Sequence, residues 1–544
     1  MNNNTPPLDI TRKVVIVGAG PVGCLAAIAF AKMKWQVEVY EARPGKGDNV
    51  LVTHCLDSFF QDLRLSSSKA AAQQRSINLA ISSRGIAALR AVDASAAERF
   101  LQTVIPMRGR MIHDRQGNLQ SQQYDKDGQC INSIDRTLLN EGLLEEASAT
   151  PNIHLNFEHK VLSADFDQRV LFLRDGNSGA DVRVKFDLCI AADGSHSIIR
   201  RQLMRVVRMN FQQEYIPHEY IELKMPAGHD EHGNPAFLLD PNHLHIWPRH
   251  SFMLIALPNK VITHAASMCF PPNEIQFQDK TFTCTLFAPT VEFDRLITRE
   301  DILLWFQNHF PDALSLLGED KLLKDFEKNP RSPLITTKLT PYHYKDRCVI
   351  LGDAAHSMVP FFGQGLNCGL EDVRVLLTLL QEECVVPTRA MPNSGDPESD
   401  FIDQRLAKAL ARYSASRHED VVAICELAMD NYIEMRHSVT TPVYIIKKAL
   451  DHLLFSLTAR GPTVLSSLGD SLSRIAFPTA NPRGWLPLYT MVTFRPDISY
   501  ATARRKAARQ AIILTTMARL GTVGMCATSF YLTWRVLRWL RSQR

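Results

Sequence analysis

Three glycines, Gly18, Gly20 and Gly23, have the spacing that lets a chain hold the phosphates of a dinucleotide. Gly18 permits a tight turn, Gly20 lets a phosphate approach the backbone, and Gly23 lets the next helix pack closely on the preceding strand. The first N–H groups of that helix and its positive dipole end favour a pyrophosphate. Glu41 follows a strand-like segment at 36–40, and its carboxylate suits the two ribose hydroxyls. The pattern predicts dinucleotide binding but does not distinguish NAD from FAD.

Two further strand–turn–helix motifs decide between these cofactors. CIAADGSHSIIRR at 189–201 is a strand followed by Asp-Gly, and CVILGDAAHSMVPFFGQGLNCGLEDV at 348–373 is a strand, a Gly-rich loop and a helix. Asp353 stands at a strand end, where it suits a ribityl or ribose hydroxyl. The helix that begins near 366–367 would direct its N–H groups at a flat ring, and a reduced flavin carries negative charge there. The three motifs in this order predict FAD. They contain no recognisable flavinylation motif, so we expect the cofactor to be held without a covalent bond.

The elements that must position these motifs predict an α/β fold with more than one domain. A chain of 544 residues is too long for one compact core. We expect a Rossmann-like FAD-binding domain, an antiparallel-sheet substrate domain and a helical C-terminal region. The boundaries are 11–205 for the first part of the FAD-binding domain (with a surface insertion at 43–74), 206–334 for the substrate domain, 335–386 for the second FAD-binding part, 401–500 for the helical region that completes the substrate pocket, and 505–544 for a basic, apolar tail.

Composition excludes several other classes of protein. Eleven cysteines are scattered without a C-x-x-C pair, which argues against zinc sites and a disulfide framework and favours a reducing compartment. The N-terminus has no apolar stretch of a secretory signal. His243 and His245 would share one face of a strand in HLHIWPRH, but no carboxylate or cysteine ligand stands beside them in a recognisable motif. We therefore expect packing or surface histidines and no metal. A polar, proline-rich segment at 387–400 predicts a loop.

The order of these motifs resembles the class A flavoprotein hydroxylases, and within them the kynurenine 3-monooxygenase family. The resemblance runs through nearly the whole chain. Its motifs are RSINLA (75–80), IPMRGRMIH (105–113), YIPHEY (215–220), HLHIWPR (243–249), FTCTLF (282–287), GDAAHSMVPFFGQGLN (352–367), NYIEMR (431–436) and PLYTMVTF (487–494).

The resemblance implies two sets of site residues. The substrate of that family is L-kynurenine, and Arg110 matches the arginine that grips its carboxylate, with Tyr124, Asn431 and Tyr489 as the other polar contacts. A guanidinium suits a carboxylate because it can donate two parallel charge-assisted bonds. The positions that match cofactor contacts are Gly18, Gly20, Gly23, Glu41, Ala80, Arg136, Asp353, Leu366 and Asn367.

The resemblance also implies the reaction. NADPH reduces the FAD, O2 adds to give a C4a-hydroperoxyflavin, and the electron-rich ring of L-kynurenine takes one oxygen to give 3-hydroxykynurenine. This step belongs to tryptophan degradation and NAD biosynthesis. The flavin carries the chemistry, so no catalytic side chain is expected. Two alternatives stay open: an FAD hydroxylase of another aromatic amine or phenol, and a membrane-bound flavoprotein whose chemistry is dead.

The tail combines a long apolar stretch with positive charge only. No acidic residue follows Asp497, and arginines and one lysine flank the apolar stretch at 511–534 on both sides. A span needs roughly 20 apolar residues, and Arg519 interrupts this one. We expect a tilted or partly interfacial membrane helix, and the alternative is an amphipathic helix docked on the protein. The resemblance implies the mitochondrial outer membrane, with the catalytic part facing the cytosol. Nothing predicts a nucleic-acid partner.

Overall fold

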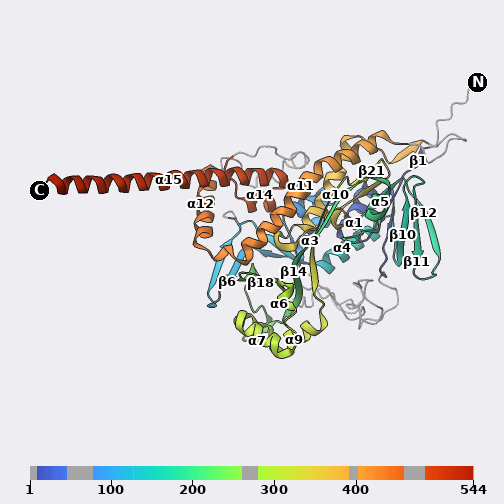
Figure 1. Cartoon of the computed structure of the whole chain (residues 1–544). Helices are drawn as coiled ribbons and strands as arrows, with labels where there is room; N and C mark the ends of the chain where they lie inside the picture. Colours follow the sequence, from blue (N-terminus) through green and yellow to red (C-terminus); the bar gives the residue numbers. More distant parts are fainter. Residues whose placement is uncertain are drawn as a thin grey trace, which may run out of the picture.

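The computed structural model describes residues 9–45, 78–125, 128–259, 280–390, 402–458 and 484–542. Two large sheets stand at its centre, helices cover them, and one long helix projects from the body (Figure 1). The predicted insertion at 43–74 lies outside the described residues from residue 46 onward. The predicted loop at 387–400 also lies mostly outside them. Its described start is a short strand, β23 (Thr388–Ala390), which pairs with β1 (Asp9–Thr11), so the loop prediction was wrong there.

The first sheet has six strands in the order β21-β22-β13-β2-β3-β9, and only β21 runs antiparallel to its neighbour. Its strands are β2 (Lys13–Val17), β3 (Gln36–Tyr40), β9 (Ile153–Asn156), β13 (Leu188–Ala191), β21 (His343–Tyr344) and β22 (Cys348–Ile350). Continuous apolar runs form its inner strands because a parallel sheet is covered on both faces. Helices α1 (Pro21–Lys32), α4 (Arg136–Ser148) and α10 (Gly365–Glu382) pack together over it. This arrangement confirms the predicted Rossmann-like fold.

The second sheet has seven strands in the order β20-β14-β19-β18-β17-β6-β7. They are β6 (Gly109–His113), β7 (Leu119–Gln123), β14 (Asn210–Met225), β17 (His243–Arg249), β18 (Phe252–Pro258), β19 (Phe282–Pro289) and β20 (Ser332–Thr340). The predicted antiparallel sheet is therefore present, with one parallel pair between β17 and β6. The strands β6 and β7 come from the N-terminal part of the chain, and β6 carries Arg110.

Four helices after β19 were not predicted. They are α6 (Thr290–Phe293), α7 (Arg299–His309), α8 (Pro311–Leu317) and α9 (Glu319–Lys328). They bury one face of the second sheet through an apolar cluster that includes Trp247, Phe282 and Phe306 (Figure 1). The capping box of Thr298 and Asp301 at the start of α7 was a local helix signal that the prediction did not use. Which sheet face these helices cover is not visible in the sequence, because it depends on long-range packing.

Two three-stranded sheets and several shorter elements accompany the two large sheets. A three-stranded sheet, β4-β8-β5, lies next to α2 in the chain, and a second one, β10-β11-β12, stands at one end of the molecule (Figure 1). The remaining elements of this part are β4 (Asn78–Ile81), α2 (Ser83–Val92), α3 (Ala94–Gln102), β5 (Ile105–Met107), β8 (Ile131–Asp135), β10 (His159–Asp165), β11 (Val170–Asp175), β12 (Asp181–Lys185), α5 (Ile198–Val206), β15 (Gly228–His229) and β16 (Pro235–Ala236).

The C-terminal part is helical, as predicted. Its elements are α11 (Gln404–Arg436), α12 (Pro442–Thr458), α14 (Leu488–Phe494) and α15 (Tyr500–Ser542). The long helix α11 packs against α10 and the first turns of α15, so it joins the flavin side of the molecule to the tail. Beyond residue 510, α15 projects from the body (Figure 1), and its described side chains there are mostly exposed. Within the described residues, no helix has both the length and the apolar character to cross a membrane.

Candidate active site

The glycine-rich loop between β2 and α1 forms an open cradle. Gly18 has a φ of +99°, and a Cβ there would lie 2.5 Å from the carbonyl oxygen of Ala192. A Cβ on Gly23 would lie 2.0 Å from the carbonyl oxygen of Gly18, so α1 starts directly against the turn. Gly20 has open space where its Cβ would be, and it lines the large cavity of the protein. The tight turn at Gly18, the close helix contact at Gly23 and the open space at Gly20 together suit the binding of a pyrophosphate.

Glu41 directly follows β3 beside this cradle. Its Oε2 accepts the N–H of Ala19 at 2.9 Å, and Arg43 donates Nε to Oε1 at 2.8 Å and Nη2 to Oε2 at 2.9 Å. Burial alone would raise the pKa of Glu41, but the hydrogen bonds and charge of Arg43 outweigh it and lower that pKa. Glu41 is thus an ionised acceptor, and a ribose hydroxyl that binds it must displace an Arg43 contact.

Asp353 and Arg136 both line the cavity. Asp353 lies in the turn after β22, and Arg136 is the first residue of α4. The Asp353 side chain is open to the cavity, but the cavity lies deep in the protein. This deep position raises the pKa of the Asp353 carboxyl, and the positive charge of Arg136 opposes the rise. A carboxyl and a guanidinium therefore offer an acceptor and a donor to the ribityl and phosphate parts of FAD.

The N-terminus of α10 opens onto the same cavity. The helix begins at Gly365, and Gly363, Gly365 and Leu366 line the space in front of it. Gly363 adopts a left-handed conformation with a φ of +65°, and a Cβ there would lie 3.2 Å from the Cβ of Ala80. Free N–H groups at a helix start attract negative charge. This end of the cavity fits a flavin ring.

Asn367 is hydrogen-bonded to the turn that precedes α10 and does not line the cavity. Its Nδ2 donates to the carbonyl oxygens of Ala80 at 2.8 Å and Gly363 at 2.7 Å, and its Oδ1 accepts the N–H of Ser82 at 2.9 Å. The side chain is fully buried. Its hydrogen bonds fasten β4 to the turn before α10, so Asn367 positions Ala80, which does line the cavity.

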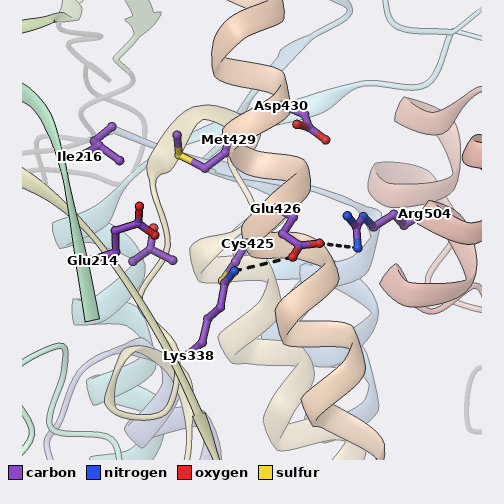
Figure 2. Close-up of a pocket in the computed structure, with 9 residues that line it drawn as sticks. Glu214, Ile216, Lys338, Cys425, Glu426, Met429, Asp430 and Arg504 are labelled. Carbon is purple, nitrogen blue, oxygen red and sulfur yellow. Dashed lines mark ion pairs between the residues drawn. The ribbon is translucent and has the colours of Figure 1, made fainter. Parts of the chain in front are cut away.

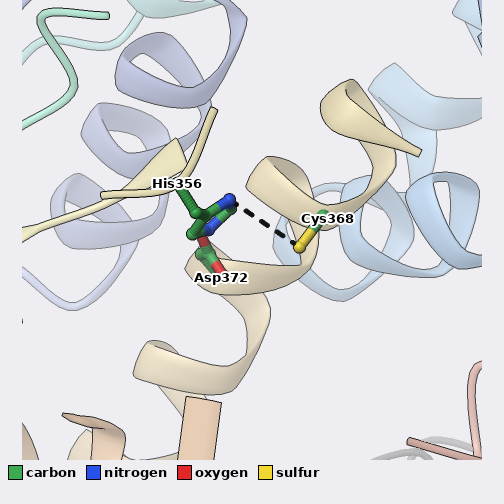
Figure 3. Close-up of side chains that lie close together, drawn as sticks. All are labelled: His356, Cys368 and Asp372. Atoms are coloured by element: carbon green, nitrogen blue, oxygen red, sulfur yellow. Dashed lines mark hydrogen bonds and ion pairs between the residues drawn. The ribbon is translucent and has the colours of Figure 1, made fainter. Parts of the chain in front are cut away.

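His356, Cys368 and Asp372 gather in a buried cluster whose donor atoms resemble a metal-binding set (Figure 3). The Nε2 of His356 lies 2.6 Å from Oδ2 of Asp372, while Arg417 donates to Asp372 at 2.9 Å and to the sulfur of Cys368 at 3.2 Å. Burial would lower the pKa of His356, but the charge of Asp372 raises it well above its ordinary value. Two cations therefore already neutralise this cluster, and they would repel a metal ion.

The histidines of β17 form hydrogen bonds inside the sheet. The Nδ1 of His245 lies 2.9 Å from Nε2 of His113, and its Nε2 lies 2.8 Å from the carbonyl oxygen of Asp240. Burial lowers the pKa of His245 to about 4, so this ring is neutral. His243 pairs with the Asp240 side chain at 2.7 Å. These contacts are those of packing histidines.

One cavity of about 420 Å³ extends from the glycine-rich loop between β2 and α1 to the predicted substrate residues. The substrate positions Arg110, Tyr124, Asn431 and Tyr489 all line it. Of the predicted cofactor positions, Gly20, Ala80, Arg136, Asp353 and Leu366 also line it, whereas Gly18, Gly23, Glu41 and Asn367 do not. Arg110 on β6, which lies 321 positions before Asn431 on α11, therefore meets residues of α11 and α14 in one space.

Arg110 is the only one of the predicted substrate residues that carries a charge. It is 5% exposed, and its Nη1 lies 3.2 Å from Oε1 of Glu434, while its Nη2 donates to Oδ1 of Asn431 at 3.3 Å. Its Nε has no hydrogen-bond partner among the described residues. Burial would lower the pKa of Arg110, but nearby tyrosines and Glu434 raise it, so the group is cationic. A buried guanidinium with an unused N–H suits an incoming carboxylate.

Aromatic rings surround this guanidinium. Tyr124 and Tyr489 stack with their centroids 4.7 Å apart, and Tyr489 also stacks on Phe362 at 5.6 Å. The Arg110 guanidinium lies 5.2 Å from the ring centroid of Tyr489. Much of the remaining lining is apolar, with Leu244, Ile255 and Phe287 from the second sheet. The cavity thus has a cationic end and walls that suit a flat aromatic molecule.

Three polar residues around Arg110 were not predicted from the sequence. Glu434 stands one helical turn after Asn431, within the quoted motif NYIEMR, so the i, i+3 spacing was a usable signal. Tyr444 donates its hydroxyl to Oε1 of Glu434 at 3.0 Å. Burial and the charge of Arg110 lower the pKa of Lys448 to about 8. Tyr444 and Lys448 lie on α12, whose position over the site depends on tertiary packing.

A second, smaller pocket of about 220 Å³ lies between the second sheet, α11 and α15 (Figure 2). Glu426 stands at its centre and forms ion pairs with Lys338, at 3.8 Å, and with Arg504. Glu214 and Asp430 add negative charge at its exposed rim. The central ion pairs fasten α11 to the sheet and to the start of α15, and the residues of the flavin and substrate cavity do not line it.

Comparisons with known proteins agree with this geometry. The FAD binding domain family matches residues 11–385. Among solved structures, the chain is similar to a tetrameric form of 2-methyl-3-hydroxypyridine-5-carboxylic acid oxygenase, with 17% identity and a TM-score of 0.55 over 80% of this chain and 95% of that one. It is also similar to p-nitrophenol 4-monooxygenase from Pseudomonas putida, with 17% identity and a TM-score of 0.52 over 82% and 94%. These structures share the fold.

The fold, the cradle and the aromatic cavity define an FAD-dependent aromatic monooxygenase. Two relatives narrow this class, and both are called kynurenine 3-monooxygenase. The protein of Cryptococcus neoformans is 42% identical over 97% of this chain and 98% of its own length. The protein of Saccharomyces cerevisiae is 37% identical over 98% and 100%. The chain belongs to the kynurenine 3-monooxygenase family.

The lowered pKa of Lys448 predicts a pH-dependent cost to stability. Its folded pKa of about 8 lies below the ordinary 10.5, so the charged amine destabilises the fold fully below pH 8 and loses this effect as the pH rises to 10.5. We expect Lys448→Met to raise the free energy of unfolding by about 1–3 kcal/mol below pH 8 and by nothing near pH 10.5. Urea unfolding at both ends of this range measures the difference.

Lys447→Met is the matched control, because Lys447 is exposed on the same helix. It should show no pH-dependent gain. A gain for Lys448→Met that is equal at both pH values would contradict the ionisation argument and point to better packing of the methionine alone.

Proposed function

We propose that this protein hydroxylates L-kynurenine to 3-hydroxykynurenine with NADPH and O2, as a step of tryptophan degradation and NAD biosynthesis. One observation carries the proposal: the buried Arg110 guanidinium, with an unused Nε, opens onto the same cavity as the flavin cradle. The names of its relatives in Cryptococcus neoformans and Saccharomyces cerevisiae support the same substrate.

The cavity residues suit the two ends of this substrate. L-Kynurenine is an amino acid joined to an aminobenzoyl ring, so it needs a charged contact at one end and apolar walls at the other. Arg110 and Asn431 would bind the carboxylate, and the stacked rings of Tyr124 and Tyr489 would hold the aliphatic part. The apolar lining from the second sheet would orient the aromatic ring by shape.

FAD, when bound, supplies the transfer of electrons from NADPH to O2 and the activation of oxygen. The chain itself must hold the ring in place and keep water away from the reacting atoms. The walls formed by Phe361, Phe362 and Leu244 serve the second purpose, because they give water no hydrogen-bond partner. The ring of an aromatic amine is electron-rich, so no side chain is needed to withdraw a proton before oxygen transfer.

Two other functions are weaker. A hydroxylase for an aromatic amine or phenol without a carboxylate would have no use for a buried guanidinium paired with Asn431 and surrounded by tyrosines. A flavoprotein with dead chemistry would not need an intact cavity in front of α10, where Gly363, Gly365 and Leu366 leave room for a ring. The arrangement around Arg110 therefore favours an aromatic substrate with a carboxylate, and the names of the relatives favour L-kynurenine among such substrates.

Steady-state oxidation of NADPH by the FAD-loaded protein tests the proposal. We expect L-kynurenine to stimulate the oxidation and the product, identified by mass spectrometry, to gain one oxygen atom at the ring carbon beside the amino group. Acid denaturation should release free FAD. If every aromatic amino acid offered gives only hydrogen peroxide and no hydroxylated product, the protein is no hydroxylase of these substrates and the proposal is wrong.

Arg110→Ala should weaken the binding of L-kynurenine while FAD stays bound. Loss of one partner of a buried charge pair costs roughly 2–5 kcal/mol, so the dissociation constant should rise by roughly 30-fold or more. Titration of flavin absorbance with L-kynurenine measures this change. Arg108→Ala is the matched control, because Arg108 is exposed and two positions away. If the parent and the Arg110→Ala variant bind L-kynurenine equally well, the substrate carboxylate binds at another residue.

We extend the proposal to location: the tail binds a membrane, which the family resemblance suggests is the mitochondrial outer membrane, with the catalytic part facing the cytosol. Nine basic residues and no acidic residue follow Asp497. The described part of α15 beyond residue 510 exposes Ile512, Ile513, Met517 and Leu520. Positive charge beside exposed apolar side chains suits anionic lipid. Because Arg519 interrupts the apolar stretch, a tilted or interfacial helix fits better than a full span.

Truncation after Gln510 should remove the contribution of the tail to membrane binding, so that less protein resists a carbonate wash, and it should leave FAD in place. The first turns of α15 are held by the body, where the N–H of Ala501 donates to Asp420 at 2.9 Å and the hydroxyl of Tyr500 donates to Gln364 at 3.0 Å. Among the side chains of α15 that the structure describes, Gln510 is the last buried one. Membrane fractionation with a carbonate wash compares the two proteins. A full-length protein found wholly in the soluble fraction would contradict the membrane proposal.

A further inference from the structure

Helix α12 exposes a continuous apolar stripe. Its members are Val443 (76% exposed), Ile446 (67%), Leu450 (37%), Leu453 (53%) and Leu457 (66%). They follow one another at alternating intervals of three and four residues, which places all five on one face of the helix. Single exposed apolar residues are common, but an ordered stripe along a whole helix indicates a partner.

The opposite face of α12 is fixed to the protein. Tyr444 donates to Glu434 at 3.0 Å, and Asp451 accepts the indole N–H of Trp485 at 2.9 Å. Phe455 packs against the apolar cluster that joins α11 and α14 to the second sheet. These residues lie about half a turn away from the stripe. The helix therefore cannot bury the stripe by rotating about its axis without breaking these contacts.

The charges around the stripe favour an anionic surface. Lys447 is exposed beside it, and the single carboxylate of α12, Asp451, lies on the inner face and is engaged by Trp485. In Figure 1, α12 stands at the end of the body from which α15 projects. The part of the chain after Asp497 carries nine basic residues and no acidic one. A second copy of the chain would bring these positive charges against its own.

We propose that the outer face of α12 binds an anionic lipid bilayer, as a contact separate from the tail. This inference rests on the proposed membrane attachment but names a different element. The stripe would enter the headgroup region and Lys447 would contact the lipid phosphates. Since Tyr444 on the inner face contacts Glu434, which pairs with Arg110, the carboxylate end of the substrate cavity lies directly under the bilayer-bound helix.

Vesicle flotation with phosphatidylcholine, with and without phosphatidylserine, tests the proposal. The FAD-loaded full-length protein and the protein truncated after Gln510 are each compared with their Ile446→Glu/Leu453→Glu variants. The truncated parent should keep binding to phosphatidylserine vesicles, and the double substitution should weaken that binding on the order of tenfold or more. Ile297→Glu is the control, because Ile297 is 81% exposed on the α6–α7 connection, and it should change nothing.

A second measurement does not depend on charge reversal. In the full-length protein, the tryptophan introduced by Ile446→Trp should be quenched by brominated lipids, and the one introduced by Ile297→Trp should not. Retained flavin absorbance and kynurenine-stimulated NADPH oxidation check that each variant is folded.

Each outcome decides between the two membrane proposals. If the full-length protein floats and the truncated parent does not, α12 is no lipid contact and the tail proposal stands. If both float equally and the α12 substitutions release the truncated protein, the tail proposal fails and the α12 proposal stands. If the Ile446→Glu/Leu453→Glu variants bind lipid as well as their parents, and brominated lipids do not quench the tryptophan of the Ile446→Trp variant, the α12 proposal is overturned. Concentration-dependent dimers that the substitutions abolish, without lipid binding, would overturn it too and assign the stripe to a second copy.

Discussion

Arg417 on α11 and the carboxylates around it hold the flavin side of the molecule to the substrate side. The guanidinium is buried and contacts Asp372, at 2.8 Å, and Glu371, at 3.2 Å, both on α10, and also Asp420 on its own helix. Asp372 in turn accepts the N–H of Gly352 at 2.9 Å. Removing any one of these charges would leave an unpaired charge in the interior, which is strongly destabilising. The turn that carries Asp353 and the helix that carries Asn431 are therefore fixed to the same group.

Arg84 extends this constraint to the last wall of the cavity. It is 1% exposed, pairs with Glu371 at 2.7 Å, and donates to the carbonyl oxygens of Val492 and Ile498 at 3.1 and 2.7 Å. The second of these bonds spans 414 positions of the chain. Helix α14, which carries Tyr489, is thereby attached to α2 and α10. The two clusters meet at Glu371, so the cofactor loop and the aromatic wall are positioned by one connected set of buried ions.

Local conformation explains which features the sequence predicts. The turn at Gly18 and the start of α10 are readable because a left-handed φ or a close backbone contact restricts the residue type at the turn itself. The helices α7 and α8 have local signals that went unused, namely the capping box of Thr298 and Asp301 and the proline at Pro311. The sheet face that the helices cover and the role of Arg84 are not readable, because they depend on contacts between distant segments. Glu434 lies between these cases: its spacing from Asn431 was visible, but its pairing with Arg110 required the fold.

The pairing of Arg110 with Glu434 follows from the cost of burying a lone cation. An isolated guanidinium in this cavity would be strongly unfavourable, so a carboxylate must stand beside it when no substrate carboxylate does. Glu434 can fill this place temporarily, because its side chain is 38% exposed whereas that of Arg110 is 6% exposed. A substrate carboxylate that replaces Glu434 at the guanidinium leaves Glu434 with the Tyr444 hydroxyl and with solvent. Under the proposed function, this exchange would keep Arg110 paired with a carboxylate at every stage, because the exposed side chain of Glu434 is free to move into solvent.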